Sequence, residues 1–258
     1  MNTALAILSH ALRMLIYDVS ATFRVLLPAV LMVLGAVLAI NVFAPEVAGL
    51  LSQQMAETAL TENPAQLYRF ALFGLIAVLG YALMAVLWHR HVLLSDADAH
   101  IRPDARTFMT YLARAVAVSF LQFLAAIPLF LVIAAVDVSM NASGDSNFSF
   151  AGTAGTFVLI WVALRLSVIL PAAAIGETMS IRDSWVMTGT RPLELLGLAA
   201  LLTGLNMLIY AFSGLLIPDA GAVASLLSTI VFMAEALIFV SVLTTLYGVL
   251  VEGRSLGQ

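Results

Sequence analysis

Long apolar stretches alternate with short polar ones along this chain, and their lengths match the thickness of a membrane. At 1.5 Å per helical residue, six of them are long enough to cross about 30 Å of hydrocarbon. They cover residues 22–43, 70–88, 113–136, 153–175, 194–217 and 223–250. The pattern predicts an all-α fold: a polytopic membrane helix bundle with six transmembrane helices in three hairpins, forming one integral membrane domain over residues 1–258.

Short amphipathic segments that carry arginine precede each predicted hairpin. Before the first span, apolar side chains recur at helical spacing at Leu5, Leu8, Leu12, Leu15 and Ile16. This spacing predicts a helix that either lies in the membrane interface or packs against its own protein. Similar segments at 103–114 and 181–191 precede the other hairpins. Three such units fit a parallel repeat, and they equally fit any six-span protein with short loops.

Arginine is distributed unequally between the two sides that this topology creates. The chain has 11 basic residues, all of them arginines. Nine fall on the side of the two termini: Arg13, Arg24, Arg90, Arg102, Arg106, Arg114, Arg182, Arg191 and Arg254. Only Arg69 lies at the opposite side. The positive-inside rule therefore predicts that the N- and C-termini are cytoplasmic.

Composition narrows the classes of function. The chain is 62% apolar and 10% charged, whereas soluble domains are about half apolar and about a quarter charged. A net charge of −4 argues against nucleic-acid binding, which needs a basic face. The absence of cysteine excludes disulfides and thiolate chemistry. No H-E-x-x-H, G-x-S-x-G or Walker pattern occurs, so we expect no cofactor and lean against an enzyme.

The stretch from 157 to 188 contains a buried charge, a helix breaker and a helix start. Arg165 lies inside the apolar run, and Pro171 follows it. A proline inside a helix removes one backbone hydrogen bond and clashes with the preceding turn. We therefore predict a kink or the end of the span near Leu170. Ser180 and Asp183 then form an S-x-x-D signal for the start of a short helix.

Arg165 and Glu235 lie at similar depths in the predicted spans. Each is about twelve residues, or about 18 Å, from the outer start of its helix. Because an unpaired charge inside a membrane is costly, we predict an intramembrane charge pair that makes the fourth and sixth spans neighbours. In the rival interpretation Arg165 reaches past Pro171 to cytoplasmic phosphates, while Glu235 stays protonated and bonds another helix.

Polar clusters at the predicted cytoplasmic ends of the spans form a candidate interface site. Its residues are His89, Arg90, His91, Arg182, Asp183 and Trp185. Tryptophan and basic side chains at this depth are typical of an interfacial belt. A metal site would need His89 and His91 to converge with Asp96, Asp98 and His100. The two histidines are two residues apart on a helix and point in different directions, so we predict no metal.

Two stretches carry a family resemblance: WHRHVLL at 88–94 and RLSVILPAAAIGETMSIRDSW at 165–185. With the six-span outline, they resemble bacterial inner-membrane proteins of the glycerophosphoryl-diester phosphodiesterase membrane-domain-like type. The resemblance implies a membrane-domain fold in the bacterial inner (cytoplasmic) membrane. It implies no enzyme activity, because the phosphodiesterase name belongs to proteins with a separate catalytic barrel, for which these polar segments are too short.

Two functions are consistent with these observations. The first is a non-enzymatic multi-pass inner-membrane protein with a scaffolding, assembly or regulatory role. The alternative is a transporter or lipid-handling protein that uses Arg165 and Glu235. Expected partners are membrane lipids and either another membrane protein or a second copy of the chain. Mutual neutralisation of the two charges would favour the first function, and a polar, water-filled cavity around them the second.

Overall fold

The computed structural model describes residues 2–45, 64–94, 103–140, 150–218 and 221–256, and no strand occurs among them. The helices are α1 Asn2–Tyr17, α2 Val19–Phe43, α5 Pro64–Leu93, α7 Ala105–Met140, α8 Phe150–Leu166, α9 Ile169–Ala174, α10 Ile181–Thr188, α11 Pro192–Leu216 and α12 Ala222–Leu250. Among the described residues, five helices are long and apolar enough to cross a membrane: α2, α5, α7, α11 and α12. The chain is therefore an all-helical protein of the multi-pass membrane type.

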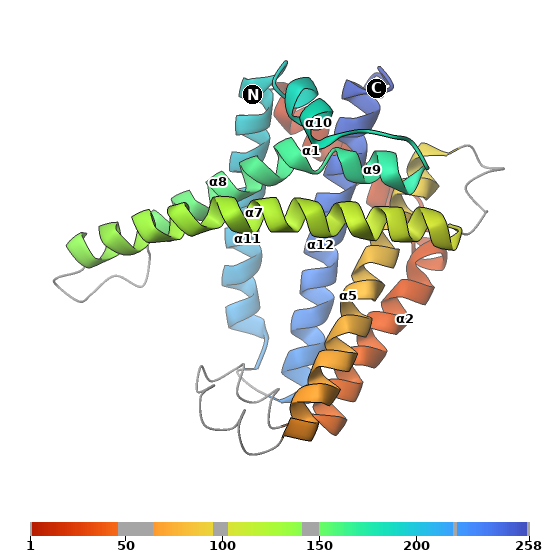
Figure 1. Cartoon of the computed structure of the whole chain (residues 1–258), viewed down its shortest axis with the longest axis vertical. Coiled ribbons are helices and arrows are strands. Elements are labelled where there is room, and N and C mark those ends of the chain that lie inside the picture. The colour runs from red at the N-terminus through yellow and green to blue at the C-terminus, as the bar shows by residue number, and fades with distance from the viewer. Residues whose placement is uncertain (1, 46–63, 95–102, 141–149, 219–220, 257–258) are drawn as a thin grey trace.

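The helices form a bundle crossed by a hairpin. Figure 1 shows α2, α5, α11 and α12 running along the long axis of the molecule, whereas α7 and α8 lie across it. Both termini lie at one end of this bundle, together with α1, α10 and the last turns of α5 and α12 (Figure 1). We call this the termini-bearing end.

The packing of the helices differs from that of three separate hairpins. Helix α2 packs along α5, and α7 packs on α8, as expected for hairpins. Helix α11, however, packs more extensively on α8 and α1 than on α12. The sixth predicted span is therefore not the main neighbour of the fifth, and α1 packs on both α11 and α12.

The fourth predicted span is the main departure from the six-span pattern. Residues 153–175 are divided between α8 and α9, with a break at Ser167 and Val168. Helix α8 has 17 residues, about 25 Å at 1.5 Å each, which is short of a 30 Å hydrocarbon core.

The break at Ser167 and Val168 lies close to the position near Leu170 at which Pro171 predicts a kink or the end of the span. Proline has no N–H to donate to the carbonyl four residues earlier, and its ring clashes with that carbonyl. The carbonyl in question belongs to Ser167, which accepts from Leu170 N at 3.0 Å instead. Helix α9 then ends before Gly176, whose φ of 86° is one that glycine adopts freely.

Helix α1 packs against its own protein. Ala4, Ile7, Leu8 and Ala11 are buried in one apolar cluster with residues of α11 and α12. At the other end of α1, the side chain of Tyr17 is 86% exposed. The sequence predicted that this helix either lies in the membrane interface or packs against the protein. Its first three turns pack against the protein, and its last turn exposes the Tyr17 side chain.

Candidate functional site

The predicted pair of Arg165 and Glu235 is not formed in the structure, because each side chain has a different partner. Arg165 Nη2 donates to the carbonyl of Trp185 at 2.8 Å. Its guanidinium carbon lies 4.1 Å from the ring centroid of Trp185 and 5.5 Å from that of Trp161. Glu235 accepts a hydrogen bond from the side-chain amide of Asn206 on α11.

The helix break is the physical reason for this correction. Since α8 ends at Leu166, the chain turns back and lays α10 over Arg165, where Ser184 Oγ donates to the Arg165 carbonyl at 2.7 Å. A backbone carbonyl and two indole faces thereby compensate the buried cation locally. The part of the rival interpretation in which Glu235 bonds a neighbouring helix agrees with the structure.

Arg165 is one of several arginines that donate to backbone carbonyls. The bonds run from Arg69 to Phe43 O (3.3 Å), Arg90 to Ala174 O (3.1 Å), Arg114 to Glu177 O (3.1 Å), Arg165 to Trp185 O (2.8 Å) and Arg254 to Leu93 O (2.9 Å). Most of these acceptors lie at or just beyond helix C-termini. Carbonyls at the ends of helices often lack intrahelical donors, and they attract positive charge. These guanidinium groups therefore hold the helices together.

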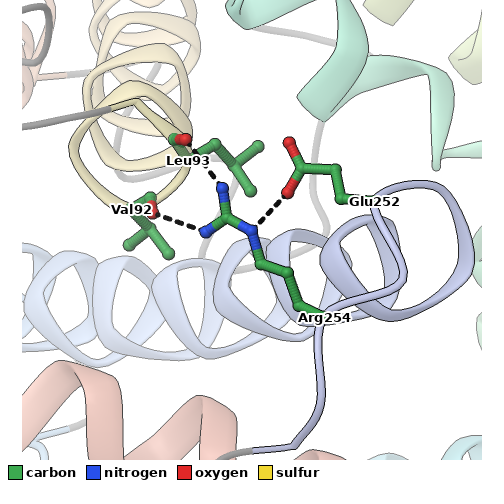
Figure 2. Close-up of polar contacts among 4 residues, drawn as sticks. All are labelled: Val92, Leu93, Glu252 and Arg254. Carbon is green, nitrogen blue, oxygen red and sulfur yellow. Dashed lines mark hydrogen bonds and ion pairs between the residues drawn. The ribbon is translucent and has the colours of Figure 1, made fainter.

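Arg254 shows the arrangement most completely (Figure 2). Its two terminal nitrogens donate to the last carbonyls of α5, Val92 O at 3.4 Å and Leu93 O at 2.9 Å. Its Nε lies 2.6 Å from a carboxylate oxygen of Glu252. The segment after α12 is thereby fastened to the end of α5.

The other residues of the predicted interface site separate into buried and exposed ones. His89 is fully buried, and its Nδ1 lies 2.8 Å from Thr244 Oγ1 on α12. Because the Thr244 hydroxyl donates to Val240 O at 2.8 Å, Nδ1 is the donor in this contact. His89 is therefore an internal link between α5 and α12. His91, two residues on, is only partly buried.

Arg182, Asp183 and Trp185 lie on α10, and all three are exposed. Asp183 and Ser180 form a reciprocal capping box at the start of this helix. The hydrogen bonds from the Ser180 hydroxyl and backbone hold the pKa of the Asp183 carboxyl below its ordinary value. Within the described ranges no three metal-ligating side chains group together, and Asp96, Asp98 and His100 lie outside those ranges.

A basic and aromatic groove lies between α1 and α5 at the termini-bearing end. On α1, His10, Arg13, Met14 and Tyr17 follow the spacing of one helical face, and Trp88, His91 and Val92 do the same on α5. Together they line a cavity of about 360 Å³. The rings of Trp88 and His91 are 5.9 Å apart. We call this the α1/α5 groove.

The polar groups of the α1/α5 groove are not used by the protein itself. The indole N–H of Trp88 is buried and has no hydrogen-bond partner. Among the hydrogen bonds and ion pairs of the described residues, none involves the side chain of Arg13, His10 or His91. Burial, helped by the nearby Arg13, lowers the pKa of His10. A bound anion would reverse this effect, because it would favour the charged imidazole.

A second groove, of about 640 Å³, lies between α7, α9 and α10 and contains Arg106, Arg114 and Ser180. Two of these residues already have partners, since Arg114 donates to Glu177 O and Ser180 bonds Asp183. The α1/α5 groove therefore has the larger supply of free donors, and it is the better candidate for a ligand.

Sequence reasoning found only part of this site. It selected His91 but not His10, Arg13, Tyr17 or Trp88. The spacing of His10, Arg13 and Tyr17 along one face of an amphipathic helix was the available signal. No family model, curated protein or solved structure matches this chain.

Proposed function

We propose that this multi-pass membrane protein is a lipid-handling protein that binds the phosphate of an anionic phospholipid in the α1/α5 groove. The observation that carries the proposal is the set of unused donors there. Arg13 supplies a permanent positive charge, and its side chain and those of His10 and His91 take part in no hydrogen bond or ion pair of the described residues. A phosphate diester accepts hydrogen bonds and carries the opposite charge.

The surroundings of the groove favour a lipid over a soluble phosphate. Tyr17 borders the groove and is 86% exposed, and its neighbour Ile16 is 71% exposed. Aromatic rings with a polar edge are enriched at the level of the headgroups. We place this end at the cytoplasmic leaflet of a bacterial inner membrane, where anionic lipids attract arginine. This placement follows the arginine asymmetry and the family resemblance.

The α1/α5 groove replaces Arg165 and Glu235 as the basis for lipid handling. Those two side chains are engaged with Trp185 and Asn206. A scaffolding role remains the second candidate, and α10 favours it. Helix α10 is fixed to α8 through Arg165, and it exposes Val186 (60%) and Trp185 (41%). A second membrane protein or a second copy of the chain could bind such a fixed apolar face.

Replacing Arg13 with glutamine is expected to weaken binding of phosphatidylglycerol about tenfold to a hundredfold. A hydrogen bond to a charged group contributes about 1.5–3 kcal/mol, and 1.4 kcal/mol is a factor of ten. Native mass spectrometry of the purified protein, titrated with phosphatidylglycerol and with phosphatidylcholine, measures the difference. Arg182→Gln, at an exposed arginine of α10, is the matched control.

The outcomes of this titration separate the sources of the anion. Binding of glycerol phosphate as strong as that of the lipid would show a soluble ligand. Equal binding of both lipids, or an unchanged affinity in Arg13→Gln, would refute the headgroup site.

The orientation can be tested with reporter fusions. Because arginines gather at the termini-bearing end, we expect the C-terminus to be cytoplasmic and the segment between Ile217 and Gly221 to be exported. A reporter that works only in the cytoplasm should therefore be active at the C-terminus and inactive between Ile217 and Gly221. A reporter that works only after export should show the reverse. Activity in the opposite compartments would reverse the proposed orientation.

A further inference from the structure

Another groove, almost wholly apolar, runs between α2 and α12. It extends from Val19 to Leu34 on α2 and from Ile230 to Leu237 on α12, and it encloses about 230 Å³. Its floor is buried, with Met84 2% and Met233 7% exposed. Its rim is open, with Val19 63% and Ile230 51% exposed. We call it the α2/α12 groove.

The two grooves share one wall. Trp88, which lines the α1/α5 groove, belongs to the same buried cluster as Leu26, Met84 and Met233, which line the α2/α12 groove. Trp88 and Met84 are one helical turn apart on α5. Met14, which lines the first groove, also packs against this cluster.

The chain connection at Asp18 also brings the grooves together. Tyr17 lines the α1/α5 groove and Val19 lines the α2/α12 groove. Asp18, between them, caps α2 by accepting a hydrogen bond from Ala21 N at 2.8 Å. The α2/α12 groove thus begins where the α1/α5 groove ends.

The α2/α12 groove has the length of a lipid tail. From Val19 to Leu34 the helix rises about 22 Å at 1.5 Å per residue. One leaflet of a membrane is half of about 30 Å of hydrocarbon, or about 15 Å. Figure 1 shows α2 running away from the termini-bearing end. A chain in this groove would therefore cross one whole leaflet.

We propose that one phospholipid occupies both grooves, with its phosphate in the α1/α5 groove and one acyl chain in the α2/α12 groove. This inference rests on the proposed headgroup site and adds a selection for lipids with long chains. A lipid chain fits better than a second helix, because a groove of about 230 Å³ that extends from Val19 to Leu34 is too narrow for a helix.

The test varies the length of the chain and the width of the groove independently. Ala234 lines the α2/α12 groove and is exposed, so Ala234→Phe adds a ring to the groove without entering the core. Ala222→Phe, at an exposed alanine at the start of α12, is the control. The probes are dihexanoyl and dipalmitoyl phosphatidylglycerol, titrated into the full-length protein and followed by native mass spectrometry.

We expect the unmodified protein and Ala222→Phe to bind the dipalmitoyl lipid at least about tenfold more tightly than the dihexanoyl lipid, since each buried methylene adds affinity. Ala234→Phe should reduce this preference to about twofold and leave binding of the dihexanoyl lipid unchanged. A chain-length preference that survives Ala234→Phe would overturn the acyl-chain site, while the Arg13 dependence could still hold. If neither lipid binds, the proposed function itself fails.

Discussion

Replacing Arg165 with leucine is expected to lower the free energy of unfolding by about 2–3 kcal/mol. The change removes a charge-assisted hydrogen bond, worth about 1.5–3 kcal/mol, and cation–π contacts worth about 0.5–2 kcal/mol. Part of the loss is offset, because the Trp185 carbonyl still accepts from Gly189 N at 3.1 Å. For a chain of this length, that corresponds to a melting temperature lower by about 5–10 °C, measurable by thermal unfolding in detergent.

Near-ultraviolet circular dichroism gives a second readout of the same change. Arg165 holds Trp161 and Trp185 with their ring centroids 6.1 Å apart in an edge-to-face arrangement. Arg165→Leu should weaken the aromatic signal of this pair, and Arg182→Leu, at an exposed site on α10, should not. An unchanged melting temperature and spectrum in Arg165→Leu would show that Arg165 does not anchor α10.

Glu235 provides a further control. Since Arg165 and Glu235 have no common partner, the effects of Arg165→Leu and Glu235→Leu should add in the double variant. Recovery of stability in the double variant would instead restore the direct charge pair that the sequence suggested.

The long helices were predictable because their ends carry local signals. Span 22–43 became α2, which begins after the capping residue Asp18, and span 194–217 became α11, which begins at Pro192. A side-chain cap and a proline in the first turn both mark helix starts. The apolar run between such signals is then long enough to set the helix.

The direction of α7 was not predictable from the same kind of evidence. The hydropathy of residues 113–136 predicts a helix in an apolar environment, but it does not predict the angle at which that helix packs against its neighbours. In the structure α7 lies across the bundle and packs on α8 and α9. The break at Ser167 ends α8 early, so α7 packs on two short helices instead of one full span.

The α1/α5 groove could not be predicted from the sequence for a related reason. His10 and Trp88 are far apart in the chain, and each has an ordinary local role, on an amphipathic helix and in an interfacial belt. Whether His10 and Trp88 line the same groove depends on where α1 packs. The choice of the Arg165 partner depended likewise on α10, whose position no local pattern encodes.

Replacing Gly80 with alanine is expected to separate α2 from α5 and lower the free energy of unfolding by about 1–3 kcal/mol, the usual cost of overpacking. A Cβ at Gly80 would meet Val33 Cγ2 at 2.6 Å, with Val33 N at 3.4 Å and Ala29 O at 3.5 Å. Val33 is fully buried and β-branched, so its side chain cannot easily rotate away. The helices must shift instead. Thermal unfolding in detergent measures the effect.

Two further variants identify the contact that is responsible. Gly74 lies on the same helix and has no atom within 4 Å of an added Cβ, so Gly74→Ala should be neutral or stabilise by up to about 1 kcal/mol through helix propensity. Val33→Ala removes the nearest atom, so it should recover much of the loss when combined with Gly80→Ala. Equal losses in Gly80→Ala and Gly74→Ala would show that the close approach of α2 to α5 at Gly80 is not the cause, because helix propensity favours alanine at both positions. If Gly80→Ala with Val33→Ala is more stable than Gly80→Ala alone, the closest contact between α2 and α5 lies at Gly80 and Val33. Alanine at position 80 is itself compatible with the helix, so only the side chain of Val33 makes it unfavourable.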